Sequence, residues 1–143
     1  MIYTELTVKA MQIAEEYHRN QKDKAGAPYV FHVYAVGDMC TSEYSVCVGL
    51  LHDVLEDTDC PEELLEQNFP IEIVDAIRAM TRPKDVSYIE YIKKLKQNSI
   101  AREVKLNDLK HNMLEQREKL CIGGKSETLK KRYIEALKIL SQE

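Results

Sequence analysis

Tryptophan is absent from this chain of 143 residues and phenylalanine occurs only twice, so aliphatic residues and eight tyrosines must fill the core. Five glycines and four prolines are too few for a collagen-like or low-complexity chain. Positive charge is not in excess either, because 20 Lys and Arg residues face 24 Asp and Glu residues. This balance argues against nucleic acid or an anionic membrane surface as the partner.

Long apolar runs are also missing. The longest stretch, Val46 to Leu51, is far below the roughly 18 residues of a membrane helix, and the first five residues do not begin a signal peptide. Without an export signal, we expect a cytoplasmic protein whose cysteines are buried free thiols rather than two disulfides. None of them has CxxC spacing: Cys40, Cys47, Cys60 and Cys121.

Apolar residues recur at three- and four-residue steps through most of the chain, as one face of a helix requires. No segment alternates like a strand, and no repeat or long linker divides the chain. We therefore expect an all-α fold, one compact bundle of about seven or eight helices over residues 1–143. The expected helices are 4–18, 30–39, 42–56, one beginning near Pro61, 70–82, 88–95, 99–114 and 126–141.

The most informative polar residues follow the most apolar segment. His52 and Asp53 come directly after Leu51, and Glu56 and Asp57 follow within one turn. On one continuous helix, His52 and Glu56 share a face, and Asp53 and Asp57 share another, turned by about 100°. Buried ionisable groups need a partner or a metal. The spacing alone leaves two interpretations open: a ligand cluster, or a helix end that reaches solvent.

Two further segments favour the cluster. His32 lies in an apolar setting after a polar loop, and Asp108 lies in an otherwise amphipathic helix, with Asn112 four residues later. Two imidazoles with two carboxylates suit a divalent ion such as Mn²⁺, Fe²⁺ or Mg²⁺. They suit structural zinc poorly, because no cysteine has ligand spacing.

Three segments carry a resemblance to a known family: QKDKAGAPYVFH at 21–32, LLHDVLEDT at 50–58 and VKLNDLKHNM at 104–113. The positions of His32, His52, Asp53 and Asp108 are similar to the metal-binding positions of the HD-domain phosphohydrolases. The longer strings resemble the hydrolase domain of the RelA/SpoT-type alarmone enzymes, and even more the stand-alone small alarmone hydrolases. The resemblance covers about residues 10–113 and leaves the last helix unmatched.

The resemblance implies that His32, His52, Asp53 and Asp108 bind one divalent ion, Mn²⁺ before Fe²⁺ or Mg²⁺. It implies a small guanine nucleotide as the partner, without nucleic acid or membrane. The reaction would remove the 3′-pyrophosphate of guanosine tetra- or pentaphosphate and leave GDP or GTP. The remaining site residues that it implies are catalytic Glu56 and Asp57, and substrate-binding Lys22, Lys24 and Asn112.

Three positions depart from the family pattern: Asp23, Val33 and Leu109. These departures keep every expected metal ligand and the Glu56–Asp57 pair. They lie at positions where the resemblance leads us to expect contacts with the phosphates and the base of the substrate. Two other functions therefore stay open: a phosphatase acting on another nucleotide, such as a nucleoside phosphate or the 2′-phosphate of NADPH, and a non-catalytic nucleotide-binding module. We interpret His18 and His111 as supporting or surface residues. The oligomeric state is left open.

Overall fold

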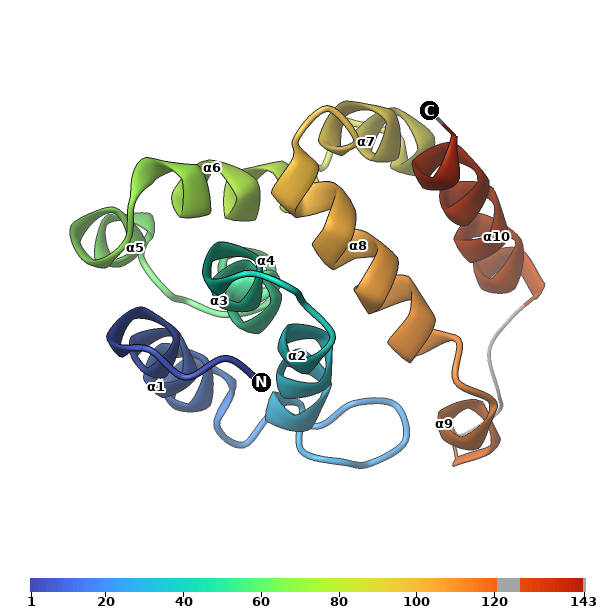
Figure 1. The fold of residues 1–143 in the computed structure, drawn as a ribbon. Coiled ribbons are helices and arrows are strands. Elements are labelled where there is room, and N and C mark those ends of the chain that lie inside the picture. Colours follow the sequence, from blue (N-terminus) through green and yellow to red (C-terminus); the bar gives the residue numbers. More distant parts are fainter. Residues whose placement is uncertain (121–126, 143) are drawn as a thin grey trace.

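The structure, a computed structural model, describes residues 1–120 and 127–142 (Figure 1). All regular structure in these residues is helical, apart from an isolated bridge between Lys22 and Pro28. The expected all-α bundle is confirmed. The helices are α1 (Glu5–His18), α2 (Val30–Asp38), α3 (Glu43–Leu51), α4 (Val54–Asp57), α5 (Glu62–Asn68), α6 (Ile71–Ala79), α7 (Tyr88–Leu95), α8 (Ser99–Asn112), α9 (Glu115–Leu120) and α10 (Glu127–Ser141).

The centre of the bundle is α3, which packs against α1, α2, α6 and α8 (Figure 1). Its N-terminus is held by a capping box in which Ser42 Oγ accepts from Ser45 N and Ser45 Oγ accepts from Ser42 N, both at 3.1 Å. Every residue from Ser45 to Leu51 is buried. A helix that is apolar on all sides belongs in the interior, and this is where the structure places it.

The prediction of one continuous helix over 42–56 is wrong, because the helix is interrupted at His52 and Asp53. The backbone of Asp53 has φ −102° and ψ 0°, in the bridge region between helix and strand. The four residues of α4 then start a new helix. This break, together with the short α9, accounts for the ten helices seen in the described residues instead of seven or eight.

Close contact between α2 and α3 depends on two glycines. A Cβ atom added to Gly49 would lie 2.8 Å from the Cα of Gly37 and 3.0 Å from its nitrogen. Only hydrogen atoms therefore separate the two backbones at this crossing. The crossing matters for the site, because α2 carries His32 and α3 leads directly into His52.

Gly49→Ala is expected to destabilise the protein by about 1–3 kcal/mol, because the methyl group meets backbone atoms that cannot turn away. Gly37→Ala should cost less, since its nearest neighbour is the flexible side chain of Leu50 at 3.0 Å. Urea unfolding of both variants measures the difference. An equal or larger loss for Gly37→Ala would contradict the proposed backbone contact.

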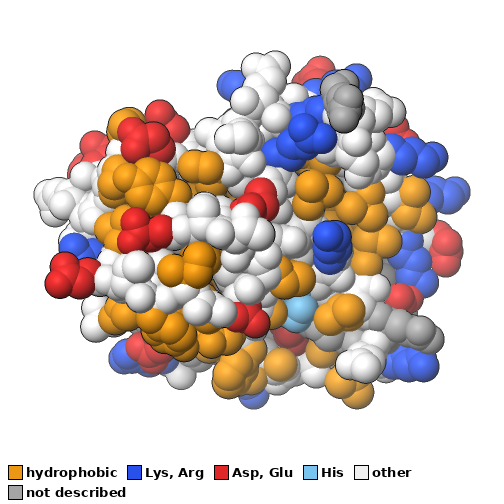
Figure 2. Space-filling view, in the orientation of Figure 1, with side chains coloured by type: hydrophobic (Ala, Val, Ile, Leu, Met, Phe, Trp, Pro, Cys, Tyr) orange, Lys and Arg blue, Asp and Glu red, His pale blue; other side chains and the backbone are white. Residues whose placement is uncertain are grey.

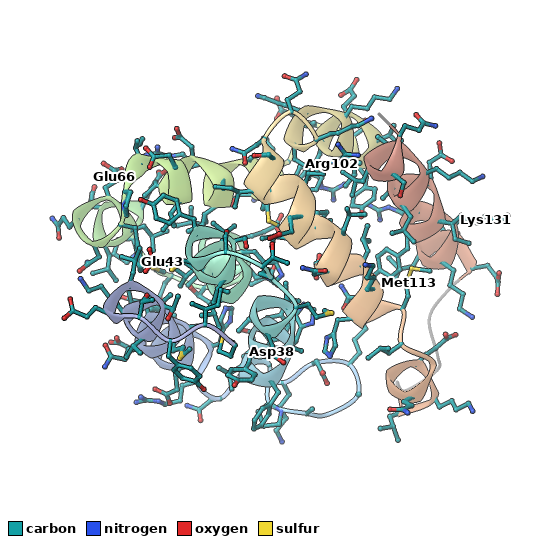
Figure 3. The ribbon with its side chains drawn as sticks, viewed as in Figure 1. Asp38, Glu43, Glu66, Arg102, Met113 and Lys131 are labelled. Atoms are coloured by element: carbon teal, nitrogen blue, oxygen red, sulfur yellow. The ribbon has the colours of Figure 1, made fainter. Side chains whose placement is uncertain are left out.

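The last helix packs on its own chain. α10 contacts α7 and α8, and it buries Ala136, Ile139 and Leu140. Arg102 of α8 closes its far end by donating from Nε to the Leu140 carbonyl at 2.7 Å and from a terminal nitrogen to the Gln142 carbonyl at 3.2 Å (Figure 3). The last helix, which the resemblance to the family did not cover, thus packs beside α8 as part of the same bundle.

Three of the four cysteines lie in the described residues: Cys40, Cys47 and Cys60 are buried free thiols, as expected. Burial raises the pKa of each of these thiols above its ordinary value. Cys121 lies outside the described residues. Among the helices that the structure describes, none combines the length and the apolar character needed to cross a membrane.

Candidate metal centre

Three helices bring the four expected ligands together. His32 comes from α2, His52 and Asp53 from the break after α3, and Asp108 from α8. His32 Nε2 lies 3.0 Å from Asp108 Oδ1 and 4.0 Å from Asp53 Oδ2, and His52 Nε2 lies 3.0 Å from Asp53 Oδ2 and 3.4 Å from Asp108 Oδ1. Two atoms that each bind one ion at about 2.1 Å are about 3–3.4 Å apart. Three of the four separations fall in that range.

The tautomer of His52 also fits a metal. Its Nδ1 lies 2.7 Å from the carbonyl oxygen of Gly49, which can only accept, so Nδ1 carries a proton. In the neutral ring, Nε2 then presents a lone pair to the cluster. This nitrogen is buried and makes no well-directed hydrogen bond to any described atom. A lone pair that faces carboxylate oxygens is the arrangement a cation between them would satisfy.

The pKa values of His52 and Asp53 in the protein without metal also favour a cation in the cluster. Burial lowers the pKa of His52, but the charges of Asp53 and Asp108 outweigh burial and raise it well above its ordinary value. Burial raises the pKa of Asp53, yet the neighbouring His52 brings it below its ordinary value. The cluster thus attracts positive charge, which a divalent ion would supply.

Asp108 is anchored by groups on its own helix. Its Oδ2 pairs with Lys105 Nζ at 2.9 Å, and its Oδ1 accepts from Asn112 Nδ2 at 3.0 Å. Burial alone would raise the pKa of Asp108, but Lys105 with both histidines holds it well below its ordinary value. Asn112 is expected to contact the substrate. In this structure its amide orients Asp108, which is an expected metal ligand.

The side chains of His32 and Asp53 contact aromatic residues. His32 Nδ1 lies 2.7 Å from His111 Nδ1, so one of the two nitrogens donates and the other accepts. The hydroxyl of Tyr29 donates to Asp53 Oδ2. His18 is buried beneath Tyr29, with ring centroids 5.0 Å apart. Both histidines that the sequence suggested as supporting or surface residues thus lie beside the cluster.

Glu56 and Asp57 lie on α4, immediately after Asp53. Both residues are exposed, and Glu56 Oε1 accepts from the backbone nitrogen of Arg82 at 3.3 Å. Desolvation by the surrounding protein and the charge of Asp53 raise the pKa of both carboxyls, that of Asp57 to about 6. A carboxyl with such a pKa can exchange a proton near neutral pH.

A cavity of about 220 Å³ opens beside the cluster. Asp53, Asp108 and Asn112 form one side, and α10 forms the other through Leu129, Arg132 and Tyr133. Arg132 stacks on Tyr88, with its guanidinium carbon 4.4 Å from the ring centroid. Figure 2 shows a histidine and a Lys or Arg side chain reaching the surface over the region between α2 and α8. Arg132 thus brings a positive charge from α10 to the same cavity that Asp53 and Asp108 line.

The polar loop before α2 stays outside this cavity. Lys22 and Lys24 are exposed, and neither lines the cavity wall. Asp23 shapes the loop instead, because its Oδ1 accepts from the backbone nitrogens of Ala25 at 2.9 Å and Ala27 at 3.0 Å. The other two departures from the family pattern, Val33 and Leu109, are fully buried in the core.

Sequence reasoning missed several residues around the cavity. Lys105 lies three residues before Asp108 on one helix, so the pair could have been found from spacing. Arg132 and Tyr88 could not, because nothing in the sequence relates α10 and the start of α7 to the motifs.

The chain is similar to a known family and to several known proteins. Residues 10–118 match the family model described as the HD domain. One relative is named guanosine-3′,5′-bis(diphosphate) 3′-pyrophosphohydrolase, and a second has the same name preceded by the word "Probable". The one from Spiroplasma citri is 34% identical over 73% of this chain, and the one from Synechocystis is 30% identical over 76% of it. The chain spans 16% of the length of each relative.

A solved structure described as a metazoan ortholog of SpoT that hydrolyzes ppGpp has the same fold. It aligns with a TM-score of 0.81 and 24% identity over 99% of this chain and 88% of the other. The alignment therefore includes α10, which no sequence motif reached. With the family model matching most of the sequence and four metal-type side chains converging from α2, α3 and α8, this chain belongs to the HD-domain family.

Proposed function

We propose that this protein is a metal-dependent phosphohydrolase that removes the 3′-pyrophosphate from guanosine tetra- or pentaphosphate, leaving GDP or GTP. The observation that carries the proposal is the meeting of His32, His52, Asp53 and Asp108 beside a cavity that Arg132 also lines. The names of the relatives supply the substrate class.

His32, His52, Asp53 and Asp108 would hold the divalent ion. We propose Mn²⁺, with Fe²⁺ and Mg²⁺ as the alternatives, because two imidazoles and two carboxylates suit ions of this hardness. A divalent ion held there lowers the pKa of a water molecule and offsets phosphate charge. The protein contributes the geometry, with Lys105 and the carbonyl of Gly49 orienting Asp108 and His52.

Glu56 and Asp57 would move protons. Their raised pKa values allow one carboxyl to accept a proton from the attacking water and to return one to the leaving group. Their place on α4, in the turn after Asp53, keeps them beside the metal ligands without making them ligands.

The cavity wall would bind the nucleotide phosphates. Arg132 offers a planar set of donors that matches phosphate oxygens, and the ring of Tyr88 restricts its position. Asn112 lines the cavity and is proposed to contact the nucleoside. Lys22 and Lys24 are proposed to meet phosphate at the cavity entrance, for which loop movement would be needed. The partner is thus a small nucleotide, and the cytoplasm is the proposed location.

Product analysis tests the proposal. Purified full chain with Mn²⁺ is incubated with guanosine tetra- and pentaphosphate, NADPH and simple nucleoside phosphates, and the products are separated by anion-exchange chromatography. We expect equimolar pyrophosphate and GDP or GTP, and loss of turnover after chelation. Release of orthophosphate alone would overturn the pyrophosphohydrolase assignment in favour of a phosphatase. Absence of any turnover would favour a nucleotide-binding module.

A further inference from the structure

We infer that Tyr29 is a positioning residue of the metal centre: its hydroxyl holds Asp53 Oδ2 in place towards the two imidazoles. The site residues that the resemblance implies do not include this tyrosine. The inference rests on the proposed metal site but not on the identity of the substrate.

Asp53 needs external support because of its backbone. It lies between α3 and α4, outside both helices, so helical geometry does not fix its side chain. Its Oδ2 is the oxygen that faces the cluster, 3.0 Å from His52 Nε2 and 4.0 Å from His32 Nε2. This is also the oxygen that accepts the hydrogen bond from Tyr29. The tyrosine thus occupies one lone pair of Oδ2 and leaves the other directed at the histidines.

Tyr29 is itself held rigidly. Its ring lies between those of His18 and His32, with centroids at 5.0 Å and 5.4 Å. His18 is fixed in turn by a contact of 2.8 Å between its Nδ1 and Gln21 Oε1. The backbone nitrogen of Tyr29 donates to the carbonyl of Gln21 at 2.8 Å, which ties the residue to the loop before α2. A donor so constrained can impose an orientation on its acceptor.

A phenol is suited to this role. Its ordinary pKa of about 10 keeps the hydroxyl protonated at neutral pH, so it donates to an ionised carboxylate under all working conditions. Partners of this kind, which hydrogen-bond the ligands of a metal, change its affinity by about 10- to 100-fold when removed. The same size of effect is expected here.

The test is Tyr29→Phe, which removes one oxygen atom and retains the ring packed between His18 and His32. Tyr34→Phe is the matched control, because Tyr34 lies on α2, the helix that Tyr29 immediately precedes, but its hydroxyl is exposed and faces Tyr3 at 3.4 Å. Mn²⁺ is titrated into metal-free full chain by isothermal calorimetry, and far-UV circular dichroism checks the fold. We expect Tyr29→Phe to raise the Kd by about 10- to 100-fold and Tyr34→Phe to leave it unchanged.

Steady-state kinetics separate the alternatives. A positioning role predicts that saturating Mn²⁺ restores much of kcat in Tyr29→Phe and leaves KM near the wild-type value. An unchanged Kd for Mn²⁺ with a raised KM would make Tyr29 a substrate contact and overturn the inference. An unchanged Kd with only a lower Tm would show a merely structural role and overturn it as well. Failure of the wild-type chain to bind Mn²⁺ would instead overturn the metal site itself.

Discussion

Replacing Asp53 with alanine is expected to abolish stoichiometric Mn²⁺ binding and, with it, hydrolysis. Its Oδ2 is the nearest carboxylate oxygen to His52 Nε2, and it also faces His32. Without Asp53, the two imidazoles and Asp108 remain. The negative charge of Asp108 is already offset by its ion pair with Lys105. The three remaining ligands would have to hold the ion against water with little net negative charge to attract it.

Calorimetry with Mn²⁺ measures the effect directly, and thermal unfolding gives an independent value. At a Mn²⁺ concentration 100 times the Kd, the wild-type protein should gain about 2.7 kcal/mol of stability, and Asp53→Ala should gain nothing. Asp85→Ala is the control, because Asp85 is an exposed aspartate in the loop between α6 and α7. Retention of one Mn²⁺ per chain by Asp53→Ala would contradict the proposed ligand set.

Glu56→Gln combined with Asp57→Asn is expected to lower kcat by about 10²- to 10⁴-fold while Mn²⁺ binding persists. The two amides keep the size and shape of the carboxyls but cannot carry the proton. Because neither residue is a proposed ligand, the Kd for Mn²⁺ should stay close to that of the wild-type protein. Glu63→Gln on α5 is the matched control, since it removes one exposed carboxylate away from the cluster. Full activity in the double variant would rule out the proton-transfer role.

Asp57 should also make the stability of the metal-free protein depend on pH. The pKa of Asp57 is raised to about 6 in the folded state, whereas the unfolded chain has the ordinary value of 3.8. The folded state therefore binds this proton more tightly. Its contribution to stability is complete below the unfolded pKa and is lost as pH rises through about 6. Asp57→Asn removes this loss, so the Tm difference between variant and wild type should grow across this window. A constant difference would contradict the raised pKa.

Much of the site could be predicted from sequence because its residues follow local rules. His52 and Asp53 stand out against the buried run before them, and the chemistry of two imidazoles and two carboxylates suggests a metal without any coordinates. Helix periodicity predicted the all-α fold for the same reason, since apolar spacing at 3.6 residues is visible in the sequence. The capping box at Ser42 is likewise a local pattern.

The break at His52 and Asp53 could not be predicted in this way. Helical periodicity continues through Glu56, so spacing favoured one helix, whereas the chain leaves it at His52. What lies there instead is a set of long-range contacts, among them Tyr29 with Asp53 and His52 Nε2 with Asp108. Such contacts join segments that lie far apart in the chain, and no local pattern contains them.

The sequence by itself determined the class of fold, and it predicted the metal ligands and the kind of ion they suit, because these depend on residue type and short spacing. Only the tertiary structure decided which groups hold those ligands and what forms the opposite wall of the cavity. Lys105, Tyr29 and His111 contact the proposed ligands, and Arg132 reaches the cavity from α10. Their roles depend on how α2, α3, α8 and α10 pack, because burial and distance, rather than residue type, make a side chain a neighbour.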